Sequence, residues 1–433
     1  MKICLFGGTF DPPHLGHQAI INQLLLKDYD LIIVMPTGDV NYKNIQIDKQ
    51  HRLAMCKLWI NSFNDQRLVV DDFEVNCCDV STTVQTLKYL IDKYPNANLT
   101  MAIGYDSYQD LDNLDDIVFI RQHLNFEVYN RNGQHNYFGN NINLSSTELR
   151  KYFNPLCVNP VILPYIAENQ LYDLQPFIVN YEQVSPYLDV ELTIRKRVNY
   201  IKQQLLASGL NNLIIGISGG QDSTLCAKLA DIAIKELGGG YHLHLVRLPY
   251  GQQLDESDCQ DVINWLDSKQ VITYNIKEVV DIVNLDIDNV SDFNKGNIKA
   301  RMRMVYQYAL AGKIGGLVLG TDHASENVTG FFTKFGDGAS DLNPLFGLNK
   351  RQGKKLLEYL DCPTHLYLKQ PTADLEDDHP QKSDEEALGI SYDTIDDYLE
   401  NKDIDINDKQ KIELLFVKTL HKRYVSNYVD ILY

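Results

Sequence analysis

The chain has 433 residues, of which 44% are hydrophobic and 23% charged, as is usual for a globular protein of roughly two or three domains. Its formal net charge of −18 disfavours a nucleic-acid partner, because binding to phosphates requires a positive surface. The sequence has no apolar run long enough to span a membrane, no signal-peptide pattern and no CxxC pair. We therefore expect a cytoplasmic protein that binds neither nucleic acid nor membrane.

The first part of the chain alternates between strand and helix patterns. Hydrophobic runs predict strands, and amphipathic segments between them predict helices. Such regular alternation predicts a parallel sheet with helices on both faces. The predicted strands are 2–6, 29–35, 67–75, 97–104 and 125–131, and the predicted helices are 15–26, 49–60, 84–94, 145–153 and 160–170.

Residues 173–190 contain two prolines and show no clear period, which predicts a linker. A second alternating series follows, and it begins with an amphipathic helix whose apolar face is Ile194, Val198, Ile201 and Leu205. The predicted fold class is α/β, with two doubly wound, Rossmann-like parallel-sheet domains at 1–172 and 191–433. The strands of the second series are 212–218, 241–248, 270–276 and 315–320, and its further helices are 222–237, 256–266, 296–312 and about 407–428.

The stretch GGTFDPPHLGH, residues 7–17, joins a glycine turn after the first strand to two histidines at the start of a helix. Free backbone N–H groups and the positive end of a helix favour an anion there. His14 and His17 are about one helical turn apart and can face one ligand. They would stabilise charge on a phosphate under attack, and phosphate transfer depends on such positioning and charge neutralisation.

This stretch resembles the signature of the nucleotidyltransferases related to class I aminoacyl-tRNA synthetases. The stretches MPTGDVNYKN, HRLAM, AIGYDS and NLSSTELR more narrowly resemble bacterial nicotinate mononucleotide adenylyltransferases, and the resemblance covers residues 1 to about 172. It implies transfer of AMP from ATP to a mononucleotide. The implied ATP-binding residues are Gly7, Gly8, Thr9, His14, His17, Ser146, Thr147 and Arg150. The implied mononucleotide-binding residues are Lys43, Thr83 and Asp106. Arg52 is implied to act with His14 and His17 near the reacting phosphates.

Two positions depart from the pattern of that family. Its Ser-Tyr-Thr reads Ser81-Thr82-Thr83 here, and Leu114 stands where many members have tryptophan. These positions lie near the pyridine ring in the family. The sequence therefore leaves open the choice between nicotinate and nicotinamide mononucleotide.

The stretch ISGGQDST, residues 217–224, is a second glycine loop between a strand and a helix, but it lacks the lysine of a Walker loop. Its phosphate cradle must consist of backbone N–H groups and the hydroxyls of Ser218, Ser223 and Thr224. Asp222 would repel phosphates unless a cation lay between them, and Mg²⁺ accepts carboxylate, water and phosphate ligands. The spacing fits cleavage of ATP between its α and β phosphates, with pyrophosphate as the leaving group.

The loop resembles the PP-loop signature of ATP pyrophosphatases, and the stretches 247–258, 292–312, 316–352 and 371–389 resemble ammonia-dependent NAD synthetases. This resemblance runs from about residue 190 to 433. It implies that ATP adenylates the carboxylate of a deamido dinucleotide and that ammonia then displaces AMP. The implied Mg²⁺ ligands are Asp222 and Glu326, and Asp222 is also the implied catalytic residue. The implied ATP site consists of Ser218, Gly219, Gly220, Asp222, Ser223, Arg247, Gln253, Thr321, Lys350 and Thr372. The implied deamido-NAD site consists of Arg301, Lys334, Asp341, His421 and Lys422.

Together the two motif sets predict a bifunctional enzyme that takes nicotinate mononucleotide, ATP and ammonia, with Mg²⁺ as cofactor. The first domain would make nicotinate adenine dinucleotide, and the second would amidate it to NAD. The first domain and the linker leave no room for a glutaminase, which predicts free ammonia as the nitrogen donor. The resemblance also implies a homodimer through the second domain.

Two alternatives stay open. In one, the second site amidates nicotinate mononucleotide, and the first site then adenylylates nicotinamide mononucleotide. In the other, the first domain is a weak, NAD-sensing regulatory module. A PP-loop that served tRNA thiolation would need a nucleophilic cysteine and an RNA surface, which the acidic charge disfavours.

Overall fold

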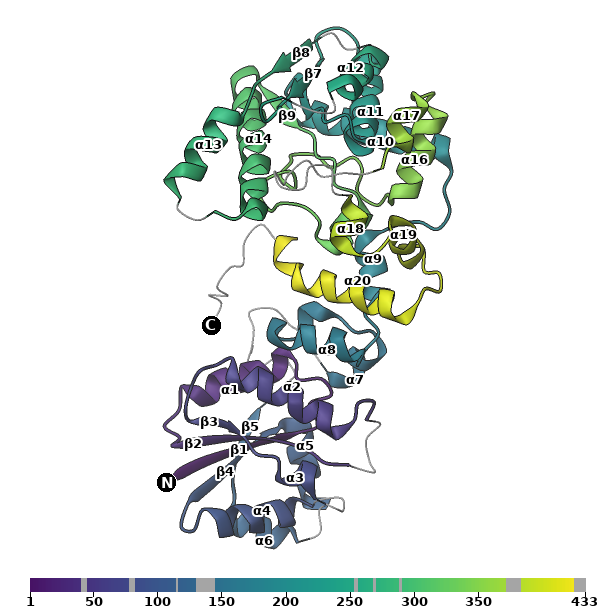
Figure 1. Cartoon of the computed structure of the whole chain (residues 1–433). Coiled ribbons are helices and arrows are strands. Elements are labelled where there is room, and N and C mark those ends of the chain that lie inside the picture. Colours follow the sequence, from purple (N-terminus) through teal and green to yellow (C-terminus); the bar gives the residue numbers. More distant parts are fainter. Residues whose placement is uncertain are drawn as a thin grey trace. The chain divides into compact units, whose positions relative to one another are not determined.

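The computed structural model of the chain describes residues 1–39, 45–77, 82–113, 116–129, 145–252, 256–267, 270–287, 290–370 and 383–423. The chain forms two compact units, which divide between Phe177 and Ile178, inside the predicted linker (Figure 1). Every pairing between the strands of each sheet is parallel. The predicted α/β class with two parallel sheets is thus confirmed. Among the described helices, none combines the length and the hydropathy that crossing a membrane requires.

A parallel sheet forms the centre of the first unit. Its described strands, in order across the sheet, are β3 (Leu68–Val70), β2 (Leu31–Pro36), β1 (Lys2–Gly8), β4 (Asn98–Gly104) and β5 (Asn125–Tyr129). Successive side chains of a strand point to opposite faces, so Ile3, Leu5, Ile33 and Met35 share one face and pack into one core cluster with Leu87, Leu90 and Ile120.

Helices cover both faces of this sheet. In Figure 1, α1 (Leu15–Leu25) and α2 (Lys49–Asn61) lie on one face, and α4 (Thr83–Lys93) and α6 (Ile117–His123) lie on the other. The remaining helices and 3₁₀ turns of this unit are α3 (Phe73–Asn76), α5 (Tyr105–Gln109), η1 (Asp110–Asn113), α7 (Ser146–Lys151), η2 (Pro155–Cys157), η3 (Pro160–Ile162) and α8 (Leu163–Asn169).

Some helices and strands of the first unit begin or end at other residues than predicted. The predicted strand 67–75 ends at Val70, because the Asp71 carboxylate accepts the Phe73 N–H at 3.0 Å and turns the chain into α3. The predicted helix 160–170 begins as the 3₁₀ turn η3, with Pro160 in its first turn, before α8 starts. The short helices α5 and α6 were not predicted.

The second unit has its own parallel sheet, whose faces are both apolar. Its described strands, in order across the sheet, are β8 (Gln270–Thr273), β7 (His242–Arg247), β6 (Asn212–Gly216) and β9 (Gly316–Val318). Leu213 and Ile215 of β6 belong to a core cluster on one face, and Ile214 belongs to another cluster on the opposite face. Burial on both faces explains why β6 reads as a continuous hydrophobic run.

Helices of the second unit cover both faces of this sheet, and others lie farther from it (Figure 1). The predicted helix 296–312 starts earlier, at Asp292, because Ser291 caps it by accepting the Asn294 N–H. The predicted helix 407–428 ends at Lys418, where the Thr419 hydroxyl donates to the Leu415 carbonyl at 2.6 Å. The helices are α10 (Val190–Ser208), α11 (Gln221–Leu237), α12 (Glu256–Trp265), α13 (Lys277–Asp286, not predicted), α14 (Asp292–Ile314), α15 (Ala324–Thr329), α16 (Lys350–Tyr359), α17 (Thr364–Leu368), α18 (Asp384–Leu388), α19 (Tyr392–Leu399), α20 (Ile406–Lys418) and the 3₁₀ turn η4 (Leu420–Lys422).

Both glycine loops follow a central strand at which the strand order reverses. The neighbours of β1 are β2 and β4, and the neighbours of β6 are β7 and β9. The connections therefore leave in opposite directions, and a crevice opens at the carboxyl ends of these strands. Each unit thus places its glycine loop where open parallel sheets bind ligands.

The predicted linker contains a helix, α9 (Gln175–Glu182). Its residues Ile178 and Glu182 are fully buried. The Asn327 side chain donates to Oε2 of Glu182 at 3.0 Å, whereas Oε1 has no hydrogen-bond partner among the described residues. Burial raises the pKa of Glu182 to about 7, against the opposing effect of the nearby Arg423 guanidinium. The segment is thus anchored in the second unit by a buried carboxyl.

The raised pKa makes Glu182 a source of pH-dependent stability. In the folded chain the carboxyl stays protonated up to about pH 7, whereas in the unfolded chain it ionises with its ordinary pKa of 4.5. Its contribution to stability is therefore complete below pH 4.5 and is lost as the pH rises through 7. Glu182→Gln keeps an acceptor for Asn327 and never ionises. We expect it to match the wild type near pH 4.5 and to exceed its unfolding free energy by roughly 1–3 kcal/mol at pH 8.

Denaturant unfolding at a series of pH values measures this difference. Glu358→Gln, on the exposed side of α16, is the matched control and should show a difference from the wild type that is flat with pH. A Glu182→Gln difference that is equally flat would contradict the raised pKa.

Candidate active sites

The glycine loop of the first unit brings the two predicted histidines together. Strand β1 ends at Gly8, and His14 is the N-cap residue of α1. The imidazole rings of His14 and His17 are stacked with centroids 3.7 Å apart, and the His14 backbone N–H donates to Nδ1 of His17 at 3.1 Å. The positive end of α1 and the two rings therefore face the same place, as an anion site requires.

The predicted phosphate residues of α7 lie against the same loop. The Ser146 hydroxyl donates to the Pro12 carbonyl at 3.3 Å, and the Arg150 guanidinium donates to the Asp11 carbonyl at 3.1 Å and to Thr147 Oγ1 at 3.0 Å. Segments that are more than 130 positions apart in the sequence thus meet at one site. Only the fold could bring them together.

Asp11 was missed by the sequence reasoning, although it organises this loop. Its side chain is fully buried and accepts hydrogen bonds from the Tyr172 hydroxyl at 2.6 Å and the Gln46 N–H at 2.8 Å. Arg150 approaches the same carboxylate at 3.7 Å. A buried carboxylate requires such partners, because an unpaired charge would be costly to desolvate.

Arg52 has different surroundings from those expected near reacting phosphates. Its side chain is fully buried, and its guanidinium donates to the carbonyls of Thr9 at 2.7 Å, Gly38 at 2.9 Å and Ile47 at 3.2 Å. Burial lowers its pKa. In this structure Arg52 ties together three loop segments around the glycine turn, and its contact with phosphates stays a prediction.

The predicted mononucleotide residues are only partly described. Thr83 begins α4, directly after its N-cap residue Thr82, and Asp106 is exposed in the first turn of α5 after β4. Helices of a parallel α/β sheet begin at the carboxyl edge, where the glycine loop also lies. Lys43 lies outside the described residues, as do Ser81 and Leu114.

The second glycine loop forms one wall of a cavity of about 590 Å³. Gly219 has a φ of +80°, and a Cβ there would lie 3.1 Å from the Cys259 backbone nitrogen in α12, so the position requires glycine. The Ser218 and Ser223 hydroxyl oxygens lie 3.0 Å apart at the start of α11. The predicted residues that line this cavity are Ser218, Gly220, Asp222, Ser223, Thr321, Glu326, Lys350 and Lys422.

A cluster of opposite charges lies in this cavity. The Lys350 ammonium is 2.7 Å from Oδ2 of Asp222 and 3.9 Å from Oε1 of Glu326. His323 Nε2 lies 3.5 Å from Asp222 Oδ1 and 3.3 Å from Glu326 Oε1. The strands β6 and β9 are neighbours, so the residues that follow them meet here. The sequence reasoning missed His323, although it stands three positions before the predicted ligand Glu326.

These charges shift one another's pKa values. Burial would raise the pKa of Asp222, but Lys350 and His323 bring it below its usual value. Burial would lower the pKa of Lys350 and of His323, but the carboxylates of Asp222 and Glu326 raise both. Burial and the Glu326 charge raise the pKa of Asp384, which also lines the cavity, to about 6. Such mutual shifts mark the cavity as a candidate active site.

The donor set fits a divalent cation. One ligand atom each from Asp222, His323 and Glu326 lies within 4.8 Å of the others. Carboxylate oxygens are the ligands that Mg²⁺ prefers, so Asp222 and Glu326 would hold this ion. The Lys350 ammonium balances the two carboxylates and would face any anionic group beside the cation.

The predicted dinucleotide residues fall into two places. Lys334 donates to the His421 carbonyl at 2.7 Å, and Arg301 donates to the Lys334 carbonyl at 3.3 Å. Lys422 follows His421 and donates to the Gly330 and Phe332 carbonyls, each at 2.8 Å. The Asp341 carboxylate accepts the Val318 N–H of β9 at 2.8 Å.

Three more residues were predicted to bind ATP in the second unit. Arg247 ends β7 and forms an ion pair with Glu256 of α12. Gln253 and Thr372 lie outside the described residues.

Two known families match two successive parts of the chain, and these parts correspond to the two motif sets. Residues 193–429 match the family model of NAD synthase, which is more than half of the chain. The chain belongs to the NAD synthase family. Residues 5–152 match the model described as cytidylyltransferase-like. The chain is therefore a fusion of a nucleotidyltransferase-like part and an NAD synthase part.

Curated relatives and solved structures resemble the NAD synthase part. The NH(3)-dependent NAD(+) synthetase of Cronobacter sakazakii is 52% identical over 260 residues, which are 58% of this chain and 94% of that protein. The crystal structure of NAD+ synthetase from Burkholderia pseudomallei is 37% identical with a TM-score of 0.50, and covers 57% of this chain and 95% of that one. NMN synthetase from Francisella tularensis is 31% identical with a TM-score of 0.52, and covers 56% and 99%.

Removing the ammonium of the NAD synthase cavity tests its role as a counter-charge. Lys350→Met would leave Asp222 without its nearest positive charge, and breaking a buried pair on one side is destabilising. Because Asp222 is 21% exposed, we expect a moderate loss of about 2 kcal/mol in unfolding free energy. Mg²⁺ should then raise the Tm of this variant more than that of the wild type.

Thermal unfolding with and without MgCl₂ measures both effects. Lys355→Met, on the exposed face of the same helix, controls for the loss of one lysine. A Lys350→Met variant with the wild-type Tm and no added response to Mg²⁺ would show that the cluster is not held as described.

Proposed function

We propose that the chain is a bifunctional enzyme for the last two steps of NAD synthesis. The first unit would convert nicotinate mononucleotide and ATP to nicotinate adenine dinucleotide and pyrophosphate. The NAD synthase part would amidate that dinucleotide to NAD with ammonia and a second ATP. The observation that carries the proposal is that each parallel sheet places its own glycine loop at its own switch point, with a different set of charged partners.

In the first reaction, an oxygen of the mononucleotide phosphate attacks the α-phosphorus of ATP, and the bond to the β-phosphate breaks. This step needs positioning and charge neutralisation rather than a protein nucleophile. The N–H groups at the start of α1, together with Arg150 and the α7 hydroxyls, would hold the phosphates. His14 and His17 would stabilise the charge that develops as pyrophosphate leaves.

In the second reaction, an oxygen of the substrate carboxylate attacks the α-phosphorus of ATP, and pyrophosphate leaves. Ammonia then attacks the acyl carbon, the bond to AMP breaks, and the new nitrogen loses a proton. The loop N–H groups and the hydroxyls of Ser218 and Ser223 would cradle the phosphates, and Lys350 would neutralise part of their charge. When bound by Asp222 and Glu326, Mg²⁺ would supply further neutralisation of the pyrophosphate.

The similarity to an NMN synthetase is consistent with the alternative order of the two reactions. In that order the NAD synthase part would amidate nicotinate mononucleotide first, and the first unit would then adenylylate nicotinamide mononucleotide. The identity to the NAD+ synthetase is 37% and that to the NMN synthetase is 31%, so the relatives favour the dinucleotide acid as substrate.

One assay separates these orders and tests whether the two sites are independent. Purified protein receives nicotinate mononucleotide, ATP, MgCl₂ and ammonium, and the products are followed by chromatography. We expect His17→Ala to reduce adenylylation by at least about a hundredfold, because it removes charge stabilisation, while it still amidates supplied dinucleotide acid. Asp222→Asn should instead accumulate nicotinate adenine dinucleotide.

Nicotinamide mononucleotide that accumulates in the His17→Ala variant would establish the alternative order. Loss of both activities, or of neither, in either variant would count against independent sites. Glutamine in place of ammonium, in ammonia-free buffer, should give no NAD. NAD formed from glutamine alone would overturn ammonia as the donor.

A homodimer through the NAD synthase part stays a prediction. It is supported by large apolar side chains that α13 and the start of α14 expose, among them Ile282, Leu285 and Phe293, which are 57%, 78% and 66% exposed. A sedimentation mass of one chain at working concentrations would contradict it.

A further inference from the structure

Two short helices carry the charges that face Asp222. Helix α15 has six residues and carries Glu326, and α16 carries Lys350 at its first position. The distances between Lys350, Glu326 and Asp222 therefore depend on how α15 and α16 are held against each other. A shift of about 1 Å between them would change these interactions strongly, since charge interactions fall with distance.

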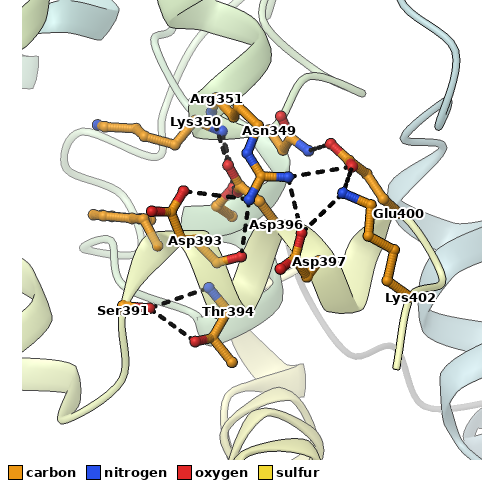
Figure 2. A network of polar contacts seen from close by, with 12 residues as sticks. Asn349, Lys350, Arg351, Ser391, Asp393, Thr394, Asp396, Asp397, Glu400 and Lys402 are labelled. Carbon is orange, nitrogen blue, oxygen red and sulfur yellow. Dashed lines mark hydrogen bonds and ion pairs between the residues drawn. The ribbon is translucent and has the colours of Figure 1, made fainter. Parts of the chain in front are cut away.

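One buried carboxylate joins the two helices. Asp396 of α19 is 1% exposed. Its Oδ1 accepts the Ser325 hydroxyl of α15 at 2.7 Å. The same oxygen accepts the Lys350 N–H at 3.3 Å, and Oδ2 accepts the Arg351 N–H at 2.7 Å; Figure 2 shows Asp396 beside Lys350 and Arg351. The Ser325 oxygen also accepts the Lys350 N–H at 3.1 Å. Ser325 is adjacent to Glu326 in the sequence, Lys350 belongs to the charged cluster itself, and Arg351 is adjacent to Lys350.

Asp396 also satisfies the start of α16. The first N–H groups of a helix have no partner inside the helix, and a carboxylate there is favoured by the helix dipole. Asn349, the N-cap residue, accepts the Gln352 N–H at 2.9 Å. The Arg351 N–H is bonded to Asp396, and the Lys350 N–H is shared between Asp396 and the Ser325 oxygen. The carboxylate thus fixes the first turn of α16, from which the Lys350 side chain leaves.

The remaining acids of α19 and its C-cap residue Glu400 surround the Arg351 guanidinium. Arg351 contacts Asp393 at 3.3 Å, Asp397 at 2.9 Å and Glu400 at 3.3 Å, and Figure 2 shows these groups around its guanidinium. The Asp393 side chain is 85% exposed. Exposed ion pairs contribute little to stability, so Asp393 serves as a matched control on the same helix.

We propose that Asp396 is a positioning residue of the ATP site in the NAD synthase part. By binding Ser325 and the first turn of α16 at once, it holds Glu326 and the Lys350 ammonium in register around Asp222. Asp396 does not line the cavity and acts through these two helices. The inference rests on the proposed use of ATP by this unit.

The test compares three variants of the full chain: Asp396→Asn, Ser325→Ala and the control Asp393→Asn. Asparagine keeps the shape of aspartate but places an NH₂ donor against at least one of the N–H or hydroxyl donors. We expect Asp396→Asn to raise the Kd of ATP in MgCl₂, measured by calorimetry, and the KM for ATP in amidation by about tenfold. Ser325→Ala removes the hydroxyl that joins Asp396 to α15 and accepts the Lys350 N–H, but it leaves Asp396 bonded to the first turn of α16, so it should raise both about threefold. Asp393→Asn should change neither.

Adenylylation of the mononucleotide by the first unit is measured on the same samples and should not change in any variant. An Asp396→Asn variant that has a lower Tm but the wild-type Kd and KM for ATP would show a merely structural role and overturn the proposal. If Asp396→Asn does not fold, Ser325→Ala decides, and an unchanged Kd and KM there overturns it equally. A wild-type chain without ATP-dependent amidation would instead refute the proposed function.

Discussion

The NAD synthase part depends on an ammonium that lies close to two carboxylates in its cavity. Charges of one sign cannot be concentrated away from water without partners, so Asp222 and Glu326 require Lys350, and Lys350 requires them. This requirement fixes what surrounds the cavity. The ends of β6 and β9 must be neighbours, and α16 must begin beside α15. The cluster thereby joins segments that span more than 120 residues of sequence.

The same topological solution appears twice in the chain, with different chemistry. In each unit a glycine loop leaves a central strand at the point where the strand order reverses. The first loop adds two stacked histidines at a helix N-terminus and an arginine from a distant helix. The second adds an aspartate, with a lysine and a glutamate as its partners. Fold topology thus places both sites, and the side chains at each loop decide what it can bind.

Residues next to a strand–loop–helix motif could be predicted from the sequence, because local spacing fixes their relative positions. His14, His17, Ser218 and Asp222 belong to this group. The surroundings of Arg52 could not be predicted, because its buried guanidinium donates to three carbonyls from separate loop segments. His323 gave no local signal of its own, since a single histidine beside two acids is common in sequences. The helix α9 was not predicted, because it is short and carries a proline, Pro176, at its second position.

The sequence by itself determined the two α/β units, the two glycine loops and the order of these two parts along the chain, because hydrophobic period and glycine spacing are local properties. Only the tertiary structure decided which distant groups meet. The pairing of Arg150 with the Asp11 loop, of Lys350 with Asp222, and of Asp396 with α15 and α16 all arise from long-range packing. The physical reason is that buried polar groups must find partners, and those partners come from whichever segment the core brings near.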